Sequence, residues 1–74
     1  MQNVTYCVIV IKDNVVNNSF GFSSFEKAES MFVDQVIDHE GNQSSDELSG
    51  AIEEGYWEFK DNGSVCLTSI TSRV

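Results

Sequence analysis

The spacing of apolar side chains changes twice along this chain, and these changes divide it into elements. Residues 4–11 are a β-branched run, and residues 16–22 form a second extended stretch after a polar turn; together they predict a hairpin. Between residues 23 and 41 the apolar positions recur every three or four residues instead, which indicates an amphipathic helix. Its predicted apolar face contains Phe25, Ala28, Phe32, Val33 and Val36.

Both predicted helices have recognisable ends. Ser23 three residues before Glu26 is a capping box, and Gly41 supplies a residue that can end the first helix in a left-handed conformation. The same spacing recurs in residues 44–47, so we expect a second, short helix that starts after Ser44 and ends at Gly55. The first helix is long enough to cover the strands with its apolar face.

The first hairpin sets which strand face meets the helices. A two-residue loop at residues 13–14 would place one set of apolar side chains together, and we expect this set to face the helices: Cys7, Ile9, Ile11, Val16, Phe20 and Phe22. The opposite face then carries Tyr6, Val8 and Val10. Because the first strand is apolar on both faces, we expect it to be central in the sheet. The alternative is that residues 71–74 or another strand order cover the second face.

The second hairpin, residues 56–70, has two possible registers. A two-residue turn at residues 62–63 divides its apolar side chains between the faces. A three-residue loop at residues 61–63, with glycine as a bulge, pairs Phe59 with Val65 and Trp57 with Leu67 on one face, and we favour it. Cys66 then points away from the core and Cys7 into it, on opposite sides of the sheet.

The predicted order of elements is therefore β-β-α-α-β-β. Residues 1–74 are expected to form one small α+β domain: a two-layer sandwich in which a four-stranded antiparallel sheet carries both helices on one face. The central pair would be the first strand and one strand of the second hairpin.

Charge narrows the possible partners. Twelve acidic residues against four basic ones give a net charge of −8, and residues 26–58 contain ten of the acids and one base. Such a surface repels nucleic acid and anionic lipid, and it attracts basic proteins. The residues predicted to form the partner-binding face are Glu26, Asp34, Asp38, Asp46, Glu47, Glu53 and Glu54. The alternative is that this charge only keeps the domain in solution.

In size and charge the chain resembles small acidic inhibitors from phages and mobile elements, including anti-restriction and anti-CRISPR proteins. That resemblance lies in composition and carries over no individual residue. It implies a non-enzymatic inhibitor or regulator that imitates nucleic-acid phosphates and docks on a basic, nucleic-acid-binding surface of a partner protein. The competing hypothesis is a self-associating domain that forms a homodimer through Tyr6, Val8 and Val10.

Catalytic and metal-binding signals are weak. His39 lies between Asp38 and Glu40, yet neighbouring helical residues point about 100° apart, so we expect no acid–base pair and no enzyme. Residues 38–49 are spaced like a calcium loop, but Gln43 and Ser49 stand where glycine and glutamate belong. We therefore expect neither a metal nor a cofactor.

Two cysteines without a leader sequence, and no apolar run of about 20 residues, favour an intracellular, cytoplasmic protein that does not enter a membrane. Cys7 in its apolar strand is expected to be an inert packed thiol, and Cys66 to be the more exposed of the two.

Overall fold

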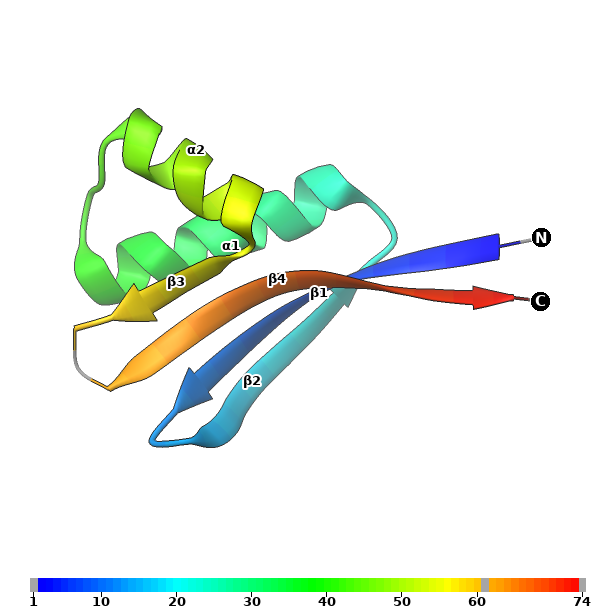
Figure 1. Cartoon of the computed structure of the whole chain (residues 1–74), viewed down its shortest axis with the longest axis horizontal. Helices are drawn as coiled ribbons and strands as arrows, with labels where there is room; N and C mark the ends of the chain where they lie inside the picture. The colour runs from blue at the N-terminus through cyan, green and yellow to red at the C-terminus, as the bar shows by residue number, and fades with distance from the viewer. Residues whose placement is uncertain (1, 61, 74) are drawn as a thin grey trace.

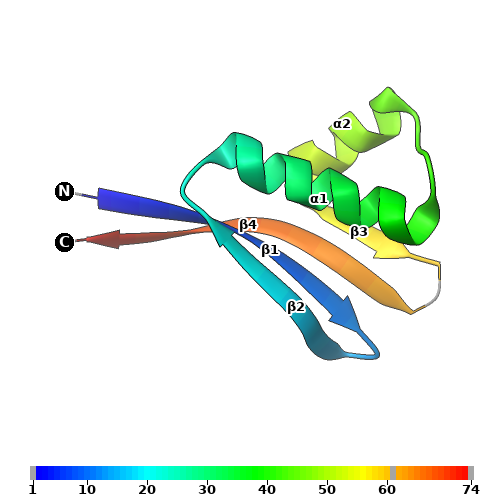
Figure 2. The ribbon, with the colours of Figure 1, turned by 180° about the vertical axis from the view of Figure 1, so that it is seen from behind.

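A computed structural model describes residues 2–60 and 62–73 and confirms the predicted fold class. The elements are β1 (Gln2–Lys12), β2 (Val15–Phe22), α1 (Phe25–Glu40), α2 (Ser45–Glu54), β3 (Tyr56–Phe59) and β4 (Gly63–Arg73). The strands form one antiparallel sheet in the order β2-β1-β4-β3. Both helices lie on the same side of it (Figure 1), and α1 crosses the sheet while α2 packs against α1 and β3 (Figure 2). The central pair is β1 and β4, so the strand of the second hairpin that was expected beside the first strand is β4.

The observed helix ends agree only partly with those predicted from the sequence. The N-cap of α1 is Ser24, whose side chain makes no capping hydrogen bond, so the capping box predicted for Ser23 and Glu26 is wrong. With Ser24 as the cap, Glu26 stands one position too early to reach back to it. In α2 the Glu47 N–H donates to Ser44 Oγ over 3.2 Å, and Gly55 ends the helix in the left-handed region at φ 74° and ψ 28°, both as expected.

A β-bulge changes which face of β1 is buried. The turn has the expected two residues, Asp13 and Asn14, both at positive φ, and Ile11 pairs with Val16. Between Val10 and Ile11 the register then shifts. Because β2 contributes one extra residue there, Phe20 lies opposite Val8 and not opposite Cys7.

This single-residue slip reverses the predicted faces of β1. Phe20 and Phe22 do pack on the core, but they share their face with Tyr6, Val8 and Val10. Val8 is 0% exposed and Val10 is 1% exposed. The prediction that Cys7, Ile9 and Ile11 face the helices is therefore wrong, because a one-residue change of register moves a whole side-chain set to the other face.

The second hairpin keeps its predicted faces but not its predicted pairs. Trp57 pairs with Val65 and Phe59 with Gly63, two residues short of the expected register. A shift of two preserves the alternation of faces, so Trp57, Phe59, Val65 and Leu67 still pack together on the helix side. Asp61, which the prediction placed in the loop, lies outside the described residues.

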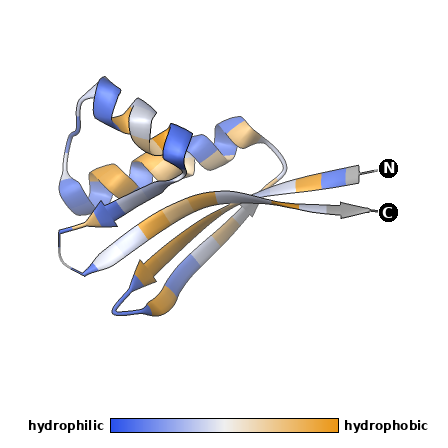
Figure 3. Cartoon of the chain, viewed as in Figure 1, coloured by the Kyte–Doolittle hydropathy of each residue, from blue (hydrophilic) through white to orange (hydrophobic). Residues whose placement is uncertain are grey.

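The core lies between α1 and the two central strands. Its fully buried centre is Phe32 of α1, packed with Val8 and Val10 of β1 and Val65 of β4. The remaining buried members are Ala28, Val36, Ala51 and Phe59. Figure 3 shows hydrophobic residues along most of β1 and hydrophilic residues at both ends of α2.

The central strands extend beyond the helical layer. Residues 2–5 of β1 pair with residues 70–73 of β4, whereas β2 ends opposite Tyr6 and β3 begins opposite Cys66. These segments form a two-stranded ribbon that projects past the helices, with residues 2 and 73 as cross-strand partners (Figure 1).

Candidate protein-binding surface

The carboxylates predicted to bind a partner lie on the helical layer. Glu26, Asp34 and Asp38 belong to α1, and α2 carries the others, Asp46, Glu47, Glu53 and Glu54. All seven residues are exposed. Among the described residues, Glu47 is the only one of them whose carboxylate makes a hydrogen bond, which it accepts from Ser44 Oγ at 3.1 Å.

These carboxylates divide into separate groups. Glu26 and Asp34 border a shallow hollow of about 360 Å³ beside Phe22, where Lys27 adds a positive charge. A second hollow, of about 330 Å³, lies between α2 and β3 and is bordered by Asp46, Glu47 and Glu54. The structure therefore brings together part of the predicted site on α2, and it does not join this part to the α1 carboxylates around one hollow.

A third hollow, of about 310 Å³, lies between the start of α1 and the end of α2. Its apolar side contains Tyr6, Phe25 and Ile52, and the rings of Tyr6 and Phe25 meet edge to face with centroids 5.5 Å apart. Glu53 and Glu54 border it. Glu54 thus lines two hollows, one on either side of the end of α2.

Three residues line the α2–β3 hollow that were not predicted to belong to the acidic partner-binding face: Tyr56, Trp57 and Glu58. The sequence assigned Trp57 wholly to the core, and it is in fact half-buried. No sequence signal marks them, because the approach of α2 to β3 depends on tertiary packing.

The predicted self-association residues are not on an open surface. Val8 and Val10 lie beneath the helices, and Tyr6 packs against the core. The uncovered sheet face instead carries Cys7, Ile9 and Ile11 of β1, all half-buried. Tyr56, 43% exposed, and Ile70, 60% exposed, lie on the same face.

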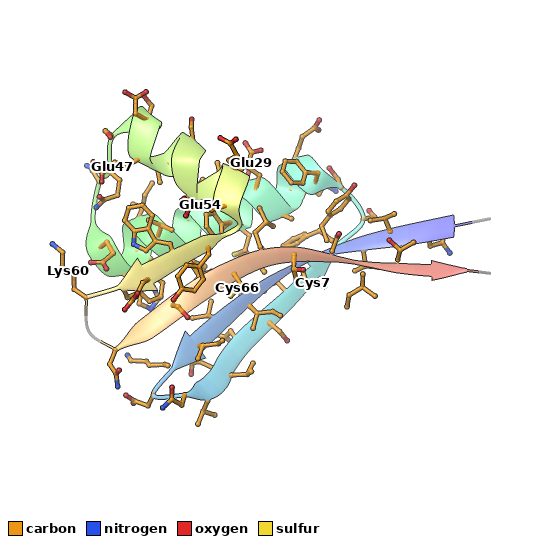
Figure 4. The ribbon with its side chains drawn as sticks, viewed as in Figure 1. Cys7, Glu29, Glu47, Glu54, Lys60 and Cys66 are labelled. Carbon is orange, nitrogen blue, oxygen red and sulfur yellow. The ribbon has the colours of Figure 1, made fainter. Side chains whose placement is uncertain are left out.

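Both cysteines point to this open face. Cys7 lies opposite Thr68, and Cys66 lies opposite Ile9, so the two are diagonal neighbours on β1 and β4; Figure 4 shows them on adjoining strands. The expectation that they lie on opposite sides of the sheet is wrong, and so is the expected core position of Cys7. Both are half-buried free thiols.

His39 is held in place by contacts with β3 and with its own helix. Its ring stacks on Phe59, with centroids 4.3 Å apart and planes 11° apart, and its Nδ1 lies 2.9 Å from the Gln35 carbonyl oxygen. The neighbouring Glu40 accepts a hydrogen bond from the main-chain N–H of Lys60 at 2.7 Å. His39 and Glu40 therefore both join the end of α1 to β3 and the turn that follows it.

The described residues contain neither a candidate metal site nor a helix that could span a membrane. Within residues 2–60 and 62–73, no three His, Cys, Asp or Glu side chains gather in a way that could hold a metal ion. Over the same residues, neither helix has the length and apolar character needed to cross a membrane.

Comparisons with known proteins found no matching family model and no significant similarity to a curated protein or a solved structure.

Proposed function

We propose that this chain is a non-enzymatic protein-interaction module that acts inside the cell. Its acidic helical layer docks on a basic surface of a partner protein, at the place where that partner binds nucleic acid, and so inhibits or regulates it. The observation that carries the proposal is the exposure of all seven predicted carboxylates on one layer. Long-range attraction between such a layer and a basic groove speeds their encounter and favours the correct orientation.

The experiment captures partners on the immobilised chain at about 0.15 M salt. A variant with Asp34→Lys and Asp38→Lys should lose the captured protein, and added duplex DNA or RNA should release it from the unchanged chain. Both positions are exposed, so the variant should keep its circular dichroism spectrum. Equal capture by the folded variant, or a captured protein that nucleic acid does not displace, would overturn the proposal.

A second candidate is self-association through the open sheet face. The observation in its favour is the apolar group of Cys7, Ile9 and Ile11, which no helix covers. A charge placed on this face should prevent the contact between copies, and Ile9→Lys introduces one there. Val8→Lys would not test the idea, because Val8 is in the core.

Light scattering after gel filtration, at about 0.05 M and about 0.5 M salt, decides it, because salt screens charge repulsion between copies but does not weaken apolar contacts. A dimer that persists at high salt and dissociates on Ile9→Lys would support this candidate. A monomer under both conditions would exclude it.

A further inference from the structure

One edge of the sheet lacks most of the features that keep an edge strand from pairing with another chain. Natural edge strands are usually short, charged or covered. β3 has these protections, because it has only four residues, includes Glu58 and packs against α2. β2, at the other edge (Figure 1), has eight residues and neither a charge nor a proline. Among the described residues it pairs only with β1, and no loop main chain bonds to its outer side.

The β-bulge limits this free edge to the second half of β2. Asn17 has no partner on β1, because the register shifts between Val10 and Ile11. A bulge twists a strand away from regular pairing and so protects that part of an edge. Residues 18–22 follow the bulge and pair with β1 without interruption. They present a regular edge about 17 Å long, at about 3.4 Å per residue.

The hollow of about 360 Å³ between α1 and β2 lies beside this regular edge. Its apolar floor is Phe22 of β2 and Met31 of α1, both half-buried. The register places Phe20 and Phe22 on the helix side of the sheet. A strand added to β2 would therefore point every second side chain toward α1, on the side where the hollow is open. α2 leaves that side free, because it packs toward β3 (Figure 2).

The rim of this hollow indicates the chemistry of the segment. The polar residues that border it are two acids, one base and a serine: Glu26, Asp34, Lys27 and Ser30. The whole chain has a net charge of −8, so a segment with basic residues is attracted to it. The apolar floor suits an aliphatic side chain, and the flexible Met31 side chain can adjust to its shape.

A second copy of the chain fits this edge less well than a single extended segment does. Two copies joined antiparallel through β2 would have their α1 helices on the same face of one continuous sheet. The acidic rims, with Glu26 and Asp34 in each, would then face one another, and juxtaposed like charges oppose association. A bare strand brings no helix and no such repulsion.

We propose that residues 18–22 of β2 bind an extended segment of a partner protein as a fifth strand of the sheet. One aliphatic side chain of the segment fills the hollow between α1 and β2, and basic side chains two positions before and after it meet Glu26 and Asp34. Main-chain hydrogen bonds supply affinity in this mode of binding, and the alternate side chains supply specificity. The inference goes beyond the proposed function, because the segment need not belong to a nucleic-acid-binding surface.

The probe is a capped five-residue peptide with leucine at its centre, threonine on either side and lysine at both ends. It is titrated into the isotope-labelled chain at about 0.15 M salt, and NMR follows the amide signals. Two matched peptides each carry two N-methyl groups, on both threonines in one and on leucine and the last lysine in the other. Since alternate residues of a strand direct their N–H groups to opposite sides, only one of these peptides loses donors to β2.

We expect the amide signals of residues 18–22 to shift on binding. The Kd of one methylated peptide should exceed that of the other by about 10-fold, as expected for the loss of two hydrogen bonds. The inference is overturned if the two methylated peptides bind equally, or if the shifted amides lie away from residues 18–22 and the hollow.

Ser30→Phe fills the hollow without changing any charge, and it should raise the Kd of the unmethylated peptide about 5-fold by a steric clash. Ser49→Phe is the matched control, because Ser49 is an exposed serine on α2 outside the hollow. Its Kd should be unchanged, and equal effects of the two variants would contradict the inference. Circular dichroism confirms that both are folded.

A second pair of variants tests the rim if Ser30→Phe does not fold. Asp34 and Asp38 are both exposed on α1, and only Asp34 borders the hollow. Asp34→Asn should raise the Kd about 2-fold, as expected for an exposed ion pair, and Asp38→Asn should leave it unchanged. Equal effects of these two variants would also overturn the inference.

Hydrogen exchange of the chain alone tests the other occupant. Protection of the amides of residues 18–22 that increases with protein concentration would mean that a second copy occupies the edge, and would overturn the inference. Exchange that does not depend on concentration supports a free edge. The proposed function is judged separately by partner capture, since Ser30→Phe leaves every charge of the acidic layer in place.

Discussion

Glu40 and Lys60 are twenty residues apart in sequence, and the carboxylate of the first accepts a 2.7 Å hydrogen bond from the main-chain N–H of the second. This bond fixes the end of α1 to the turn that follows β3. Beside it, the stacked rings of His39 and Phe59 make a second contact between the same two elements. The position of β3, and with it the α2–β3 hollow, depends on this junction.

Glu40→Ala should lower the free energy of unfolding by about 1 kcal/mol, because it leaves the Lys60 N–H without its charged acceptor. Urea denaturation measures the change. Asp38→Ala is the control, since Asp38 is exposed and an acid near a helix C-terminus is slightly unfavourable; it should be neutral or mildly stabilising. Equal losses for the two variants would contradict a role for the Glu40–Lys60 bond.

The glycine inside α2 and the glycine that caps it should respond in opposite directions to alanine. A Cβ added at Gly50 would meet no atom within 4 Å, so Gly50→Ala should stabilise the protein by about 0.5–1 kcal/mol. Gly55 has φ +74°, and a Cβ there would lie 2.6 Å from the Leu67 carbonyl oxygen. Gly55→Ala should therefore destabilise the protein by more than about 1 kcal/mol. Thermal unfolding followed by circular dichroism checks both signs.

Because of the β-bulge, substitutions at Val8 and at its neighbour Ile9 on β1 should differ in their effect on stability. Val8→Thr places a hydroxyl in the core at a 0% exposed position and should cost about 1–3 kcal/mol. Ile9→Thr, on the open face, should cost less than about 1 kcal/mol. Urea denaturation of the two variants decides between the faces: a larger loss for Ile9→Thr would mean that the bulge is absent and the opposite face is buried.

Both thiols should react with a disulfide reagent in the folded protein, since Cys7 and Cys66 are half-buried on the uncovered face. Absorbance at low protein concentration counts the thiols that react, and Cys7→Ser and Cys66→Ser assign them. Reaction of Cys7 only after unfolding would contradict its position. Protection of both thiols at high concentration would instead favour the homodimer.

The strands, the helices and their two-layer arrangement could be predicted from the sequence, because they depend on the periodicity of apolar residues and on the residues at helix ends. Gly55 and the pair Ser44–Glu47 mark the two ends of α2, although Gly50 in its middle weakens the helix signal. The faces of the second hairpin were predicted correctly because the error in register was two residues. The acidic residues could be placed on the surface for a similar reason: carboxylates without partners stay in water.

The faces of β1 could not be predicted in the same way. Both of its faces are apolar, so composition gives no preference between Val8 and Ile9. The choice depends on one extra residue in β2 near Asn18, and an Asn-rich strand shows no sequence signal for such a bulge. The α2–β3 hollow was missed for a different reason, since the approach of α2 to Trp57 depends on tertiary packing.

The ribbon formed by the ends of β1 and β4 has a consequence for how this domain could be joined to other chains. Residues 2 and 73 are cross-strand partners, so their Cα atoms are separated by about 5 Å, the usual spacing of an antiparallel pair. A host protein could carry the whole domain as an insertion in one surface loop, because the two connections would leave from the same point. The helical layer lies away from that point (Figure 2), so a domain grafted in this way, or tagged at either end, would still present its carboxylates to a partner.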